Sequence, residues 1–146
     1  MYLFCCDNLD PWLEQDLEKG KEKYLEENED VIFKYSDPIM IYHYNRSNIV
    51  YYTEISDNPE IWILELNVDK SCSYHNYTNI YYEYSLDDIL LTARQLFDES
   101  TGDVNKEDIE NMYKRLIEKG SYGIPDELLS EQGYHHHFRM YKIESI

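Results

Sequence analysis

Hydrophobic and polar residues follow two different spacings along the chain. In the first half, β-branched and aromatic residues form short runs separated by polar segments rich in Asp, Asn, Ser and Pro, a pattern typical of β-strands and turns. Because the first four runs lie only a few residues apart, the sequence predicts an antiparallel meander. The predicted strands are 31–35, 39–44, 48–55, 60–68 and 80–84.

In the segments 86–99 and 106–119, hydrophobic residues recur every three or four positions, which predicts two amphipathic helices. Ser85 and Asn105 stand directly before them and suit the N-cap position. Gly120 follows the second helix and can adopt the left-handed conformation that ends one. After it, the chain predicts a short helical turn and a last strand near the C-terminus.

The start of the chain predicts one more helix, over residues 11–28. Asp10 suits the N-cap, Pro11 suits the first helical position, and Trp12 would begin an apolar face. Gly20 weakens the middle and allows two shorter helices instead. With no repeat and no linker, residues 1–146 predict a single acidic α+β domain. Its antiparallel sheet would have about five to six strands, with an N-terminal helix and two to three C-terminal helices.

Charge narrows the choice of partner. The chain has 30 acidic and 13 basic residues, a net charge of −17, yet its 16 Tyr, 4 Phe and 2 Trp favour a folded domain over disorder. The 10 acidic and 3 basic residues of segment 1–30 give −7, whereas the tyrosine-rich segment 31–84 carries only −4. Nucleic acid and anionic membranes are therefore excluded as direct partners, while a basic protein surface remains attractive. An acidic surface also serves solubility.

The sequence contains no long apolar run and begins without the features of a signal peptide, so we expect a cytoplasmic protein. Its three cysteines are an odd number, which favours reduced thiols. His135 and His137 would share a strand face and form a weak zinc pair, as would Cys72 with His75. Neither pair has further ligands at metal-site spacing, and no nucleotide-binding loop is present. The sequence therefore predicts no metal, no cofactor and no catalytic residue.

The central strands have two apolar faces. In 60–68, Trp62 and Leu64 point to one side, while Ile61 and Ile63 point to the other. The predicted helices can cover one face. The other face would need a further helix or a second copy of the chain, or it would present tyrosines to a partner.

Aromatic rings beside carboxylates suit a partner built to hold nucleic acid, because carboxylates can replace phosphates and tyrosines can replace bases. The leading hypothesis is a small acidic inhibitor, not an enzyme, that binds and occludes a basic nucleic-acid-handling protein. A phage anti-defence protein (anti-CRISPR or anti-restriction) and an immunity protein against a nuclease toxin both fit. The alternatives are an enzyme with an unlocated carboxylate–histidine site and a dimerising scaffold subunit. The predicted partner-binding residues are Glu26, Glu27, Glu29, Asp30, Tyr81, Tyr82, Tyr84, Asp87 and Asp88.

Overall fold

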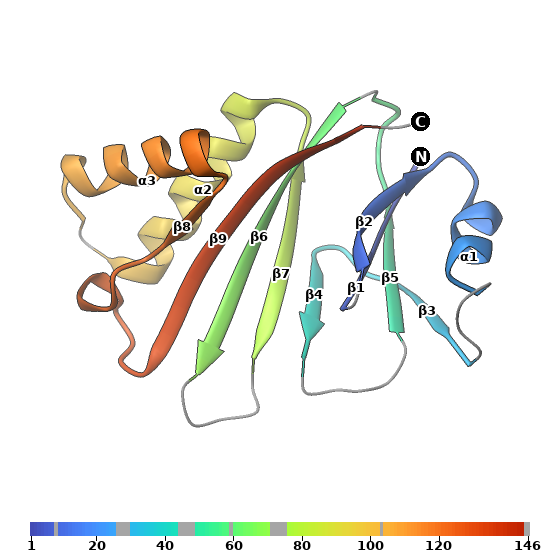
Figure 1. Cartoon of the computed structure of the whole chain (residues 1–146), viewed down its shortest axis with the longest axis horizontal. Coiled ribbons are helices and arrows are strands. Elements are labelled where there is room, and N and C mark those ends of the chain that lie inside the picture. The colour runs from blue at the N-terminus through green and yellow to red at the C-terminus, as the bar shows by residue number, and fades with distance from the viewer. Residues whose placement is uncertain are drawn as a thin grey trace.

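The computed structural model describes most of the chain. The described residues are 1–7, 9–25, 30–43, 49–58, 60–70, 76–102 and 104–144, without the side chains of 23 and 25. Within them the fold is α+β, as predicted, but it contains two sheets instead of one. The sheets pack face to face, and helices cover both outer surfaces (Figure 1).

The larger sheet has five described strands, and all of its neighbouring strands are antiparallel. In spatial order they are β4 (Ile39–Tyr42), β7 (Tyr77–Glu83), β6 (Glu60–Lys70), β9 (Tyr134–Glu144) and β8 (Ser121–Gly123). Its outer face is covered by α2 (Leu86–Thr101) and α3 (Lys106–Lys119) (Figure 1). A short 3₁₀ turn, η1 (Asp126–Leu128), precedes β9. The strand and the turn predicted near the C-terminus are thus confirmed.

The smaller sheet has four described strands and carries the remaining helix, α1 (Leu17–Leu25), on its outer face (Figure 1). In spatial order its strands are β2 (Leu9–Glu14), β1 (Tyr2–Cys6), β5 (Ile49–Glu54) and β3 (Ile32–Tyr35). The layers therefore run helix, sheet, sheet, helix. No helix in the described residues is long and apolar enough to span a membrane.

The two apolar faces of β6 are confirmed and explain the layering. Leu64 and Leu66 join the core beneath α2 and α3, whereas Ile61 and Ile63 join the core between the two sheets. Leu3 of β1 closes that second core from the smaller sheet. The sheet face that we expected a helix, a second copy or a partner to cover is thus covered by the smaller sheet. The dimer hypothesis and the expected tyrosine platform both lose the open face on which they rested.

The predicted capping of α2 and α3 is confirmed. The Ser85 hydroxyl accepts a hydrogen bond from the Asp88 backbone N–H at 3.1 Å, and the Asn105 side chain accepts from Asp108 at 2.9 Å. Gly120 ends α3 with a φ of 70°. Each cap satisfies a backbone donor that the first helical turn leaves free.

The predicted helix over 11–28 is wrong in its first part. Residues 9–14 form β2, whose Trp12 is paired with Phe4 of β1 and stacks on its ring at 5.3 Å between centroids. This hairpin forms because β1 is apolar on both faces and buries them in two cores, which outweighs the capping signal at Asp10 and Pro11. The helix begins later, where the Asp16 side chain accepts a hydrogen bond from the Glu18 N–H at 2.8 Å.

The predicted meander is also wrong, although all five predicted strands exist. β3 pairs in parallel with β5, and β4 pairs with β7, so the chain passes from sheet to sheet between consecutive strands. Among the five predicted strands, only β6 and β7 are both consecutive and paired. The turn signals mark where strands end but do not say which sheet the next strand joins, because both sheets offer apolar faces of the same kind.

Candidate functional site: the acidic end and the polar cleft

One end of the molecule gathers carboxylates. The end of β5, the start of β6, the end of β7, the start of α2 and the end of β9 meet there, at the top of Figure 1. Seven carboxylates from these segments, opposed by Lys142 and the terminal amino group, leave a net charge of −5. We call this surface the acidic end; its carboxylates are Glu54, Asp57, Glu60, Glu83, Asp87, Asp88 and Glu144.

Ion pairs neutralise only part of this surface. The Lys142 Nζ lies 3.5 Å from Glu60 and 3.6 Å from Glu144, and the terminal amino group lies 3.1 Å from Asp57. The other four carboxylates make no ion pair with any described residue. Asp87 and Asp88 are exposed in the first turn of α2, where the helix dipole favours negative charge. The acidic end therefore presents to solvent carboxylates that no described ion pair neutralises.

Two of the predicted tyrosines belong to this end. The rings of Tyr82 and Tyr84 meet edge to face at 6.2 Å, and Tyr84 is 36% exposed. The Tyr84 hydroxyl accepts a hydrogen bond from the Ser56 N–H at 3.0 Å, which fixes the ring beside the β5–β6 connection. Burial, and then the Asp37 carboxylate, raise the pKa of Tyr82. The two rings form a half-buried aromatic edge among carboxylates.

The structure does not gather all of the predicted residues. Tyr81 faces the opposite side of β7 and packs against the core under α2. Asp30 precedes β3, in the part of the molecule beside α1, whereas Asp87 and Asp88 begin a helix on the opposite outer face (Figure 1). Residues 26, 27 and 29 lie outside the described residues. Tyr82, Tyr84, Asp87 and Asp88 are thus the predicted residues that the fold brings together.

A second candidate site was not predicted, and it lies between the two sheets. The inner face of the larger sheet is apolar near the acidic end, where Ile61, Ile63 and Ile80 contact the smaller sheet. Farther along the same strands it becomes polar, with Glu65 and Thr78 on that face. A cleft of about 580 Å³ opens there. We call it the polar cleft.

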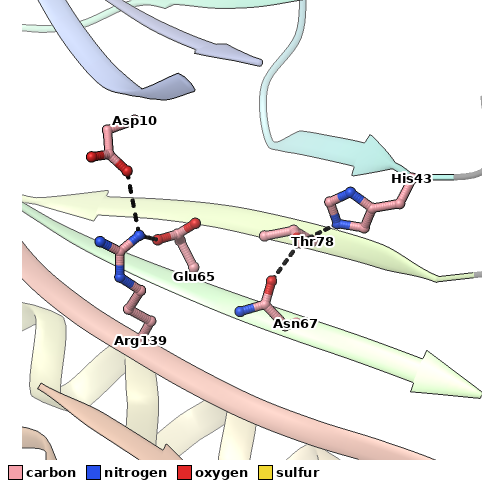
Figure 2. A network of polar contacts seen from close by, with 6 residues as sticks. All are labelled: Asp10, His43, Glu65, Asn67, Thr78 and Arg139. Carbon is pink, nitrogen blue, oxygen red and sulfur yellow. Dashed lines mark hydrogen bonds and ion pairs between the residues drawn. The ribbon is translucent and has the colours of Figure 1, made fainter. Parts of the chain in front are cut away.

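Arg139 holds one side of the polar cleft (Figure 2). Its Nη1 donates to Glu65 Oε2 at 3.0 Å and lies 3.5 Å from Asp10 Oδ1, so it links β9 of the larger sheet to β2 of the smaller one. Burial alone would lower the pKa of Arg139, but Glu65, Tyr141 and Asp10 raise it overall. Burial and Glu65 also raise the pKa of Tyr141, whose ring lies 4.5 Å from the guanidinium carbon.

A chain of hydrogen bonds crosses the other side of the polar cleft (Figure 2). The Thr78 hydroxyl donates to Asn67 Oδ1 at 2.5 Å and lies 2.7 Å from His43 Nε2. On its other side His43 Nδ1 lies 2.5 Å from Asp7 Oδ1, a carboxylate that can only accept. The His43 ring therefore lies between the Asp7 carboxylate and the Thr78 hydroxyl.

The sequence held one signal for the polar cleft. Glu65 occurs in phase with Ile61 and Ile63, so a charged residue follows two apolar residues on the same strand face and needs a partner where it is buried. The predicted histidine pair lies elsewhere: His135 contacts Asp126 at 3.1 Å. Among the described residues, no group of three His, Cys, Asp or Glu side chains is placed to hold a metal ion. Cys72 and His75 lie outside them.

Comparison with known proteins gives no lead, since no family model, no curated protein and no solved structure matches the chain. Its chemistry is therefore inferred from its own residues.

Proposed function

We propose that the chain is a small acidic inhibitor that binds a basic nucleic-acid-handling protein and occludes its nucleic-acid site. The observation that carries this proposal is the acidic end, where carboxylates without ion-pair partners lie at the same end of the molecule as the exposed Tyr84. Carboxylates form short, charge-assisted hydrogen bonds with Arg and Lys, as phosphates do. A tyrosine ring can stack with an arginine or occupy the place of a base.

In this proposal the negative charge speeds association with the target, and the tyrosines slow dissociation from it. A net charge of −17 attracts a cationic surface over distances of about a Debye length, which speeds encounter and weakens as salt rises. Once docked, partly buried aromatic groups supply the area that slows dissociation. Tyr82 and Tyr84 are held for this role because their rings contact each other and Ser56 fixes the Tyr84 hydroxyl. Anti-defence and immunity proteins would both use such a surface.

Charge-reversal kinetics test the proposal. A target captured from lysate is immobilised, and its association rate is measured with Asp87→Lys/Asp88→Lys and with Asp87→Asn/Asp88→Asn. We expect the lysine pair to slow association about tenfold and the asparagine pair about threefold, because steering depends on the sign of the local field. A matched control reverses Glu107 and Glu118, two exposed acids of α3, and changes the total charge equally.

The control decides what the charge does. If the Glu107→Lys/Glu118→Lys variant slows association as much as the α2 variant, only the total charge matters and the acidic end is not the docking surface. If the lysine and asparagine pairs at α2 have equal effects, Asp87 and Asp88 act as local hydrogen-bond acceptors instead of steering charges.

One observation favours a second candidate function, a hydrolytic enzyme. Asp7, His43 and Thr78 form a carboxylate–imidazole–hydroxyl sequence at the polar cleft, the order of groups that activates a hydroxyl nucleophile. The Thr78 side chain is buried in a strand and its hydroxyl donates to Asn67 instead of to His43, so this function ranks second. Chromogenic ester and phosphoester substrates test it: turnover that His43→Gln abolishes would place the enzyme first.

A further inference from the structure

A second pocket lies on the helix side of the larger sheet, at the end opposite the acidic end (Figure 1). The start of β7, the start of β9, the end of β4 and the end of α2 contribute to it, and its volume is about 380 Å³. The described tyrosines in its wall are Tyr42, Tyr77, Tyr81 and Tyr134. Neither the acidic end nor the polar cleft includes this pocket.

The tyrosine walls stand close together. Tyr42 and Tyr77 are paired across β4 and β7, and their ring centroids are 5.9 Å apart at an angle of 52°. Tyr134 already attracts a cation, since the Lys70 Nζ lies 5.2 Å from its ring centroid. Aromatic faces carry partial negative charge and bind ammonium or guanidinium groups that come within about 6 Å.

The polar groups of the pocket are also suited to a cation. Glu99 and Glu131 are exposed at its rim. Burial is the main cause that raises the pKa values of Tyr81 and Tyr77, and Glu99 and Glu131 are smaller causes in the same direction. The Asn79 amide donates through Nδ2 to the Tyr81 hydroxyl at 3.4 Å, while its buried Oδ1 accepts no hydrogen bond from any described residue. The pocket therefore offers acceptors and aromatic faces.

His136, the histidine that lines this pocket, does not repel a cation. His136 lies in the pocket with its Nδ1 3.1 Å from the Ser100 hydroxyl. Burial lowers the pKa of His136, so its ring is neutral at neutral pH. The described lining contains no Lys or Arg, and Lys70 lies against Tyr134 outside that lining.

We propose that this pocket binds an alkylguanidinium or alkylammonium ion, with the cationic head against the tyrosine rings and its N–H groups directed to Asn79, Glu99 and Glu131. The guanidinium is the better fit, because it is planar, weakly hydrated, stacks on aromatic rings and carries five donors. The proposal stands apart from the inhibitory role, since it concerns the opposite end of the molecule. The cation has two sources, a free small molecule or an arginine side chain of a protein.

Isothermal titration calorimetry with propylguanidinium tests the site at about 0.15 M salt, where nonspecific attraction to an acidic protein is screened. We expect saturable binding at one site, weaker binding of propylammonium and none of propylurea, the neutral analogue. N-acetylarginine amide distinguishes the sources: binding as tight as propylguanidinium indicates an arginine side chain, and binding at least tenfold weaker indicates a free molecule. Either result supports a cation site.

Paired variants separate the pocket from the overall charge. Glu99→Gln/Glu131→Gln should weaken binding roughly tenfold, because charge-assisted hydrogen bonds are lost. Glu107→Gln/Glu118→Gln, on exposed positions of α3, removes the same charge elsewhere and should change binding less than twofold. Tyr134→Phe should retain affinity, whereas Tyr134→Leu should lose roughly fivefold, because only the former keeps an aromatic face.

Three results would overturn the proposal: no saturable binding of propylguanidinium, equal binding of propylurea, or an equal loss in the α3 control. All of the carboxylates changed are exposed, so the Gln variants should fold, and circular dichroism verifies this before titration.

Discussion

Replacing Gly20 by Ala gives the sharpest test of how the smaller sheet and α1 fit together. A Cβ atom on Gly20 would lie 2.2 Å from Cε2 and Cζ of the Phe4 ring, well inside the roughly 3.5–4.0 Å of ordinary carbon contacts. Phe4 has no exposed surface and stacks on Trp12, so the ring has no free space into which to move. The glycine therefore allows α1 to lie directly on β1.

Two opposing effects set the size of the change. In an isolated helix, Gly→Ala stabilises by about 1 kcal/mol. Forcing an extra methyl group into a packed core costs about 1–3 kcal/mol, and this overlap falls at the high end. We therefore expect Gly20→Ala to lower the free energy of unfolding by about 2 kcal/mol, measured by urea denaturation followed by circular dichroism.

Two controls isolate the contact. Glu22→Ala, at an exposed position of the same helix, should change stability by less than about 0.5 kcal/mol. In a Phe4→Leu background, Gly20→Ala should cost less, since the smaller side chain relieves the overlap and the two positions are coupled. A stabilisation of about 1 kcal/mol by Gly20→Ala alone would show that α1 does not rest on Phe4.

Three further predictions concern other parts of the fold. Asn105→Ala should destabilise the chain by about 1 kcal/mol through loss of the α3 cap, whereas Asn111→Ala, exposed in mid-helix, should be neutral or stabilising in the same urea titration. Glu65→Gln should cost about 1–2 kcal/mol, less than a fully buried ion pair, since its partner Arg139 is half-exposed; an unchanged urea midpoint would show that the contact is not formed. Because burial lowers the pKa of His136, folding favours the neutral ring, so stability should fall as pH drops below about 6.5. His136→Asn should flatten that decline, and identical pH profiles would contradict it.

The sequence predicted the parts of the fold that depend on local signals. The second and third helices could be placed because an N-cap and amphipathic spacing mark each, and Gly20 was noted as a weak point in the first. The sequence could not predict why a glycine is needed at position 20. The Phe4 ring leaves no room for a Cβ atom there, and Phe4 is distant in sequence. Pairing between distant strands, such as β3 with β5, likewise depends on tertiary packing.

The candidate sites were predictable to a similar degree. Asp87, Asp88, Tyr82 and Tyr84 are close in sequence, so their proximity followed from the end of a strand and the start of a helix. Arg139 and Glu65 are 74 residues apart and meet only because β6 pairs with β9. The polar cleft lies between the two sheets, and no local sequence pattern predicted the second sheet.

The proposed inhibition is tested most directly by competition for nucleic acid. Proteins captured by the immobilised chain at low salt are identified, purified and mixed with a labelled nucleic acid that they bind. We expect the chain to displace that nucleic acid, and Asp87→Lys/Asp88→Lys to displace it at least tenfold less effectively. If the chain does not displace the nucleic acid, or if the unchanged chain and the Asp87→Lys/Asp88→Lys variant displace it equally well, the acidic end does not occlude such a target.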